Sequence, residues 1–259
     1  MEHPALGAVA QIGLLGPVEV TVAGEPRDAS TPMQRCLLAA LALDAGRVVT
    51  VDTLVDRLWG QAPPAGARRT LHTYVWAARQ ALSGAGDPIA RTAGGYVLRL
   101  EAEQIDVFRS RRLLSATGQN RAATLQAAVD LWRGEPLTGV PGDWAARVRE
   151  TLAQEHVDVV TQWADAMSAS GMSHQLIAPL SRLAERYPLA DPIAGALIRA
   201  LSDAGRSTEA LAQFERHRRH LAEELGADPG AARRHLTDAL GIYATLESPD
   251  ADRVRRLLR

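Results

Sequence analysis

The chain begins with two short stretches in which apolar and polar side chains alternate. Residues 18–22 read Val-Glu-Val-Thr-Val, and a Gly16-Pro17 turn separates them from the run Gln-Ile-Gly-Leu-Leu. Alternation with a period of two is typical of strands that bury one face. We therefore expect an antiparallel hairpin here, a second turn over residues 23–26, and a third short strand over residues 27–29.

The apolar spacing becomes that of helices after Ala29. Thr31, Pro32 and Gln34 mark a helix start, because threonine caps, proline suits the first helical position, and the glutamine completes a capping box. This first helix is predicted to run to about Ala45, where Gly46 ends it in the left-handed conformation. A second helix is predicted from a cap at residue 50 to residue 60.

The third predicted helix is the stretch PPAGARRTLHTYVWAARQAL, residues 63–82. At 100° per residue, its apolar side chains form one narrow stripe, which predicts a face that packs in the core: Leu71, Val75, Ala78 and Leu82. The opposite face carries Arg69, Thr73, Trp76 and Gln80.

That opposite face has two interpretations. A solvated surface is one of them, but such a surface normally mixes both signs of charge, and no Asp or Glu occurs from residue 57 to residue 86. Trp76 on a polar face also exposes a large apolar surface unless it meets a partner. The second interpretation is a surface that contacts a negatively charged partner.

A β-hairpin is predicted after this helix, because the segments Ile-Ala-Arg-Thr and Tyr-Val-Leu-Arg-Leu flank Ala93, Gly94 and Gly95. Three helices followed by a hairpin form a winged helix–turn–helix, whose third helix enters the major groove of DNA. Arg91 and Arg99, on the wing strands near the glycine tip, are candidate phosphate or minor-groove contacts, with simple solvation as the alternative.

Roles within the third helix follow from this geometry. Arginine prefers guanine, glutamine prefers adenine, and an indole can contact a thymine methyl. We expect four residues to face base edges: Arg69, Thr73, Trp76 and Gln80. Four others are expected to position the helix on phosphates: Arg68, Thr70, His72 and Arg79.

From about Glu103 onward the sequence indicates only amphipathic helices. Pairs such as 191–204 and 207–225 predict αα-hairpins, and their succession suggests a tetratricopeptide-like solenoid without a clean 34-residue repeat. Another helix start is predicted at Asp228. The expected fold class is mainly α with a small β part. It comprises a winged helix–turn–helix over residues 1–102, an all-α helical-repeat domain over residues 103–246, and a charged tail over residues 247–259.

Composition narrows the class of protein. A chain of 259 residues with 46% hydrophobic residues is long enough for one or two globular domains. The single cysteine, Cys36, lies in an apolar run and reads as a small buried hydrophobe in a reducing compartment. No signal peptide or membrane span is indicated, so we expect a cytoplasmic protein with no membrane partner. Since the net charge is −1, any contact with nucleic acid depends on local charge placement.

Motifs for catalysis and metal binding are weak. A phosphate-binding Walker loop is impossible without lysine, and neither G-x-G-x-x-G after a strand nor G-x-S-x-G occurs. His217, His220 and Glu224 share a helix face, but arginines lie between them and no cysteine is near, so we expect no metal site. The loop between Trp132 and Trp144 is interpreted as a packed connection in preference to a ligand pocket. Neither an enzyme nor a cofactor is expected.

Several segments in combination resemble one family. They are GLLGPVEV, LLAALALDAGRVVTVDTLVDRLWG, PPAGARRTLHTYV, GGYVLRL, DLWRGEPL and GRSTEALAQFERHRRHLAEELGADPG. Together they span nearly the whole chain. They resemble the Streptomyces antibiotic regulatory protein family, whose members join an OmpR-type winged helix–turn–helix to a bacterial transcriptional activation domain.

The resemblance implies a transcriptional activator of an antibiotic or other secondary-metabolite gene cluster. Such a protein binds direct repeats of double-stranded DNA near the −35 promoter element and recruits RNA polymerase holoenzyme. Direct repeats favour head-to-tail protomers, so a homo-oligomer is expected on DNA, whereas a stable dimer in solution is not implied. The resemblance also implies that the loop before the third helix contacts the polymerase: Gly60, Gln61, Ala62, Pro63, Pro64, Ala65 and Gly66.

This chain departs from the family pattern near the proposed DNA face. Gly66 stands where relatives usually have a serine, and glycine is the weaker N-cap. Residues 76–80 replace a segment usually rich in serine and basic residues, which removes phosphate contacts. The wing reads TAGGY in place of TPGGY. Besides activation, two alternatives remain: a helical-repeat module that binds a peptide or a pathway metabolite, and a repressor with the same fold.

Overall fold

A computed structural model of the chain describes residues 9–29, 31–118 and 120–225. The packing divides the chain into two compact units, Met1–Gln119 with Gln126–His156, and Asn120–Leu125 with Val157–Arg259. The described part of the first unit combines helices with two small antiparallel sheets, and that of the second contains helices. The predicted fold class is thereby confirmed. The predicted helix start at Asp228 and the predicted tail over residues 247–259 lie outside the described residues.

The first sheet has the strand order β1 (Ala10–Gly13), β2 (Glu19–Val22), β3 (Glu25–Arg27). The predicted hairpin is confirmed, but the third strand begins two residues earlier than predicted. Ala23 and Gly24 both have positive φ, 55° and 82°, so they complete the turn by themselves. Pro26 then pairs opposite Thr21 on the outer strand of this sheet, where its missing N–H is tolerated. The prediction of a turn extending to Pro26 was wrong.

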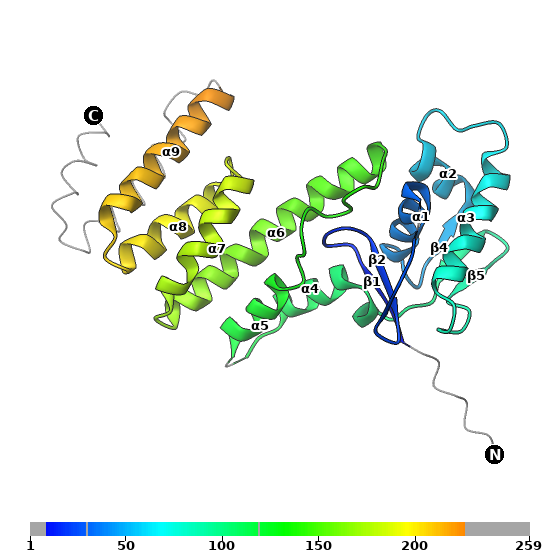
Figure 1. Cartoon of the computed structure of the whole chain (residues 1–259), viewed down its shortest axis with the longest axis horizontal. Helices are drawn as coiled ribbons and strands as arrows, with labels where there is room; N and C mark the ends of the chain where they lie inside the picture. The colour runs from blue at the N-terminus through cyan, green and yellow to red at the C-terminus, as the bar shows by residue number, and fades with distance from the viewer. Residues whose placement is uncertain (1–8, 30, 119, 226–259) are drawn as a thin grey trace, which may run out of the picture. The chain divides into compact units, whose positions relative to one another are not determined.

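Three helices and the strands of a second sheet follow, as Figure 1 shows. The helices are α1 (Pro32–Ala42), α2 (Val51–Trp59) and α3 (Ala67–Ala81). Thr31 and Gln34 form the predicted capping box at the start of α1. This helix ends three residues before the predicted Ala45, because the chain turns so that the Gly46 N–H donates to the Leu98 carbonyl at 2.8 Å.

The second sheet contains three strands in the order β4 (Val48–Thr50), β6 (Gly95–Leu98), β5 (Ile89–Arg91). The β5–β6 hairpin is the predicted wing, whereas β4 was not predicted. Thr50 pairs opposite Gly95, and a Cβ on Gly95 would overlap the Val49 carbonyl oxygen. Glycine is therefore required for this close approach. A strand as short as β4, between two helices, is too short to give an alternation signal.

Helix α1 lies at the centre of the first unit, with every residue from Cys36 to Ala42 buried. Burial raises the pKa of the Cys36 thiol to about 12, and the charge of Arg57 opposes this only in part. Cys36 is thus the small buried side chain that the sequence predicted, and its raised pKa makes the thiol unreactive.

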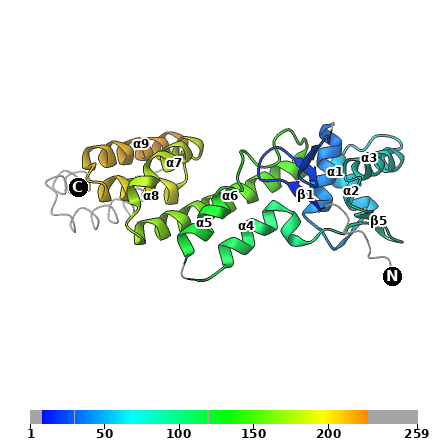
Figure 2. The same cartoon turned by 60° about the horizontal axis from the view of Figure 1, so that its bottom comes forward.

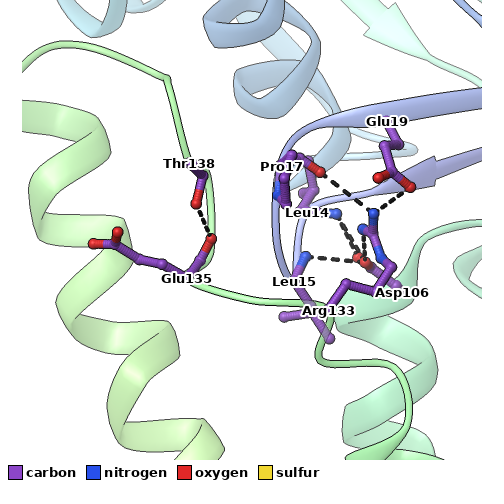
Figure 3. A network of polar contacts seen from close by, with 8 residues as sticks. All are labelled: Leu14, Leu15, Pro17, Glu19, Asp106, Arg133, Glu135 and Thr138. Atoms are coloured by element: carbon purple, nitrogen blue, oxygen red, sulfur yellow. Dashed lines mark hydrogen bonds and ion pairs between the residues drawn. The ribbon is translucent and has the colours of Figure 1, made fainter. Parts of the chain in front are cut away.

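The first unit continues past the wing through η1 (Ala102–Gln104) and α4 (Asp106–Ser115). The buried carboxylate of Asp106 accepts the backbone N–H groups of Leu14 and Leu15 at 2.8 and 2.9 Å (Figure 3). It also pairs with Arg133 at 3.0 Å, and Arg133 pairs in turn with Glu19. The domain boundary that the sequence predicted at residue 102 lies inside the first unit, because these contacts attach α4 to the first sheet.

The remaining helices are α5 (Arg121–Val129), α6 (Asp143–Ala169), α7 (Ser173–Arg186), α8 (Asp191–Asp203) and α9 (Ser207–Leu225). The division between the two units falls inside α5 and inside α6. Within the second unit α7, α8 and α9 pack side by side, as Figures 1 and 2 show. Gly205, with φ of 73°, joins α8 to α9 in the predicted αα-hairpin. After residue 103 the described residues contain helices and isolated bridges but no strand, as predicted.

Candidate nucleic-acid interface

Helix α3 buries the predicted stripe and exposes the opposite face. Leu71, Val75, Ala78 and Leu82 are each at most 2% exposed, which confirms the predicted core side. The helix begins after Gly66, whose φ is 87° and which has no side chain to cap the first turn. The first N–H groups of α3 therefore receive no side-chain cap from residue 66.

The exposed face of α3 carries the residues expected to read bases. Arg69, Thr73 and Gln80 are exposed, and Trp76 is 63% exposed although it is a large apolar side chain. Within the described part of the chain, the Arg69 guanidinium makes no hydrogen bond or ion pair, and only its backbone N–H donates, to the Gly66 carbonyl. This face thus combines an uncommitted positive charge with an indole that packs against nothing substantial in the chain.

Two other arginines of α3 are engaged within the protein, which the sequence could not show. Arg68 pairs with Asp52 of α2 at 2.6 Å, and both side chains are largely exposed. Arg79 donates from Nε and Nη2 to the carbonyl of Ile89 at 3.0 and 2.7 Å, and lies 3.6 Å from Asp87. Arg79 therefore ties α3 to the first strand of the wing.

His72 and Thr70, the other two residues expected to contact phosphates, differ in exposure. His72 is exposed and its ring lies edge-on to Tyr96 of β6, with 6.4 Å between ring centroids. Thr70 is half-buried. His72 thus lies at the junction between α3 and the wing.

The wing arginines lie at opposite ends of the hairpin. Arg91 pairs opposite Tyr96 next to the tip, whereas Arg99 follows Leu98, which pairs opposite Ile89 at the base. At about 3.3 Å per residue the two positions are about 10 Å apart along the strand. The expectation that both arginines lie near the Gly94-Gly95 tip was wrong for Arg99, because Arg99 lies beyond the end of β6. Both side chains are exposed.

Two exposed residues of this region were missed together with β4. Arg47 is exposed just before this strand, and Val48 is 51% exposed within it. Since Val48 pairs opposite Val97, Arg47 lies at the same end of the sheet as Arg99. The sequence signal that could have found them is the run Arg-Val-Val-Thr before the second helix.

The loop implied to contact polymerase, residues 60–66, is exposed apart from the half-buried Gly60. It borders a cavity of about 340 Å³ that Trp59 and Trp144 line together, so the start of α6 lies beside this loop. Arg57 stacks on the Trp144 ring at 5.4 Å and pairs with Asp44 at 2.6 Å. Trp132, at the other end of the same Gly- and Pro-rich segment, stacks on His156 with 4.2 Å between ring centroids.

The histidine cluster has a structural explanation. His217 is buried, and its ring nitrogens lie 3.1 Å from the Pro188 carbonyl and 2.6 Å from an Asp191 carboxylate oxygen. The described residues contain no group of three or more His, Cys, Asp or Glu side chains that could hold a metal ion. None of the described helices combines the length and apolarity that a membrane span requires.

The fold defines a class: a winged helix–turn–helix with an exposed third helix, followed by a helical partner region. Comparison with known proteins finds two family models that meet directly after the wing. The family model described as "Transcriptional regulatory protein, C terminal" matches residues 28–98, and the model described as "Bacterial transcriptional activator domain" matches residues 100–241.

Individual relatives agree with these matches. Regulatory protein AfsR of Streptomyces coelicolor is 37% identical over 88% of this chain, which spans only 24% of that protein. Regulatory protein DnrI of Streptomyces peucetius is 32% identical, with 89% of this chain and 91% of DnrI covered. A solved structure of Mycobacterium tuberculosis EmbR in complex with a low affinity phosphopeptide has a TM-score of 0.77 and 30% identity, covering 97% of this chain and 66% of that one.

The chain belongs to the Streptomyces antibiotic regulatory protein family. The resemblance found in the sequence is thereby confirmed.

Proposed function

We propose that this chain binds double-stranded promoter DNA through α3 and the β5–β6 wing, and activates transcription of a secondary-metabolite gene cluster. The single observation that carries the proposal is the outer face of α3. That face is opposite the buried stripe and has no carboxylate of its own. Arg69 and the exposed Trp76 lie on it two turns apart, with polar side chains between and beside them. A helix with this face in a winged helix–turn–helix is suited to the major groove.

The proposal assigns base contacts to the exposed face. Arg69 donates to guanine, Gln80 pairs with adenine, and Trp76 contacts a thymine methyl or sugar atoms, with Thr73 between them. Arg68, Thr70 and His72 position the helix on phosphates. The Arg68 pair with Asp52 does not prevent this, because an ion pair between two largely exposed side chains contributes little and a phosphate can replace the carboxylate.

The wing supplies contacts to the backbone. Arg91 next to the tip and Arg99 at the base are exposed and have no ion pair in the described part of the chain, so each is available to a phosphate. Arg79 acts differently in this proposal, because its guanidinium is bound to the wing. It sets the position of the wing relative to α3, and its phosphate contact is secondary.

Selection from randomised duplexes with the whole chain, followed by fluorescence anisotropy on the selected site, tests DNA binding. Arg69→Ala is expected to weaken specific binding by about 5- to 150-fold, since a bidentate base contact contributes about 1–3 kcal/mol. Trp76→Ala is expected to relax the preference at one base pair. The control is Arg112→Ala on α4, whose partner Glu103 is exposed and distant in sequence from α3. If the double variant Arg69→Ala, Trp76→Ala kept full specificity, the proposed reading face would be wrong.

We further propose that the loop over residues 60–66 contacts RNA polymerase holoenzyme. Its exposure and its position at the end of α2, away from the buried stripe of α3, support this role. In transcription with purified holoenzyme, the whole chain is expected to raise transcript from the selected promoter. Replacing Pro63 and Pro64 by alanine is expected to keep DNA binding and lower activation. A fall in transcript on adding the unaltered chain would indicate a repressor and refute the proposed activation.

The operator is proposed to be a direct repeat, which places two copies of the chain head to tail. Binding to duplexes that carry one or two selected half-sites tests this arrangement. Two half-sites in the same orientation are expected to bind two protomers. Preference for an inverted repeat would refute the head-to-tail arrangement.

A further inference from the structure

Helices α7, α8 and α9 line a cavity of about 410 Å³ that is open to solvent, beside the 187–190 turn that follows α7. Ala184, Tyr187, Pro188 and Ala194 supply its apolar walls. Its volume lies within the range of about 300–1,000 Å³ found for small-ligand sites. The residues that line it come from residues 181–220, so it shares none with the proposed DNA and polymerase contacts.

A buried amide group lines this cavity without a complete set of hydrogen bonds. Gln213 is only 8% exposed, and its oxygen accepts from Nη2 and Nε of Arg216 at 2.7 and 3.2 Å. Within the described residues the amide NH2 group of Gln213 donates no hydrogen bond. The nitrogen of this NH2 group is not itself fully buried, so it can donate to an acceptor that binds in the cavity.

Arg216 and His220 supply further donors to this wall. Arg216 uses Nε and Nη2 on Gln213, which leaves Nη1 for another acceptor, and the exposed ring of His220 lies one turn further along α9. Glu185, on α7, supplies the carboxylate among the lining residues. The guanidinium has a planar set of donors that matches a carboxylate.

His217 holds the wall in place and does not take part in binding. Both of its ring nitrogens are engaged, with the Pro188 carbonyl and with Asp191. These contacts fix the turn before α8 against α9. The cavity is therefore a preformed feature of the helix packing, which lowers the ordering cost of binding.

We propose that this cavity binds an organic carboxylate. Its carboxylate accepts from the Gln213 amide and from Arg216, and its apolar body packs against Tyr187 and Ala194. The carboxylate can belong to a small organic acid or to the C-terminus of a peptide, since both present the same group. This site is independent of the proposed DNA binding, and it gives the helical region a ligand of its own.

The test uses the whole chain with phenylacetate as the small probe and phenylacetamide as its uncharged match. The tripeptide Ala-Ala-Phe, with a free or an amidated C-terminus, is the peptide probe. Binding is measured by calorimetry, and the site is located from chemical-shift changes at the Gln213 side-chain amide. We expect a carboxylate probe to bind and its amide to bind at least about tenfold more weakly. The tighter of the two carboxylates identifies the source.

The variants separate binding from folding. Gln213→Glu keeps an oxygen for Arg216 but replaces the donating NH2 group with a carboxylate, so binding is expected to fall at least about tenfold. His220→Ala changes an exposed side chain, leaves the helix packing intact, and is expected to lower affinity by a few-fold. The control is Arg219→Gln, an exposed residue of α9 that does not line the cavity, which is expected to bind normally. Equal binding of acid and amide, retention of binding in Gln213→Glu, or no binding of either carboxylate at millimolar concentration would overturn the proposal. None of these outcomes depends on DNA.

Discussion

Removal of the Asp106 carboxylate is expected to destabilise the first unit more than any exposed substitution nearby. Asp106 is 9% exposed, and it accepts from two backbone N–H groups and from Arg133. In Asp106→Ala the N–H groups of Leu14 and Leu15 lose their acceptor while they stay buried. Arg133 keeps its contact with Glu19.

The magnitude follows from these contacts. A hydrogen bond to a charged group contributes about 1.5–3 kcal/mol, so the two backbone N–H groups together account for about 3–6 kcal/mol. The contributions do not add fully, and the Arg133 side chain, which is 31% exposed, can turn to water. We therefore expect the free energy of unfolding to fall by about 3–5 kcal/mol. Asp106→Asn keeps one acceptor oxygen and is expected to lose about half as much.

Urea unfolding of the whole chain, followed by circular dichroism and tryptophan fluorescence, measures this loss. At a slope of about 1–3 kcal/mol per molar urea, Asp106→Ala is expected to lower the midpoint by about 1–5 M. The matched control is Arg112→Gln on the same helix, where the ion pair with Glu103 is exposed and contributes less than about 1 kcal/mol. If Asp106→Ala lowered the midpoint no more than Arg112→Gln, the argument that this carboxylate attaches α4 to the first sheet would be refuted.

Three further predictions concern the core thiol, the wing and its attachment to α3. Burial raises the pKa of Cys36 from 9.0 to about 12, so between these pH values the thiol ionises in the unfolded chain but stays protonated in the folded one. Ionisation therefore favours the unfolded chain, and the free energy of unfolding is expected to fall as pH rises from about 9 to 12. Urea titrations across that range check the direction, and rapid reaction of the native thiol with a disulfide reagent at pH 8 would contradict it. Gly95→Ala is expected to lower the free energy of unfolding by at least about 2 kcal/mol and to weaken DNA binding. Gly94 has room for a Cβ, so Gly94→Ala is the neutral control. Equal urea midpoints for the two variants would show that the close approach at residue 95 does not require glycine. Arg79→Lys is expected to lower stability by about 1–2 kcal/mol with an unchanged salt slope of DNA binding, while Arg91→Ala reduces that slope by about one and leaves stability unchanged. The reverse pattern, measured by anisotropy against salt and by urea titration, would show that Arg79 is mainly a phosphate contact.

Local chemistry made much of the fold predictable. The Thr31 and Gln34 capping box, the buried stripe of α3 and the αα-hairpin around Gly205 all depend on residues within a few positions of each other. Short-range rules of capping, helical periodicity and backbone freedom are sufficient for such features. The length of the turn after β2 was not predictable in the same way, because Ala23 gives no sign of its positive φ.

The sequence predicted which face of α3 is exposed, but not which arginines on that helix are bound within the protein. Periodicity identified the exposed face of α3 and its Trp76, since a helix that buries one stripe must present the opposite one. It could not show that Arg68 meets Asp52 or that Arg79 is bound to the wing, because those partners lie 16 and 10 residues away in sequence. A list of arginines on a helix therefore does not by itself indicate which of them are available to DNA.

The sequence by itself determined the succession of elements, the core face of each helix and the family, because these depend on local patterns and on residues that stay in fixed order. Only the tertiary structure decided that β4 pairs with the wing strand β6, that Asp106 joins α4 to residues about 92 positions earlier, and that the Gln213 side chain lines a cavity. The physical reason is that the free energy of a polar group depends on what surrounds it after folding. A buried carboxylate or amide is stabilising or costly according to its partners, and chain folding alone brings those partners together.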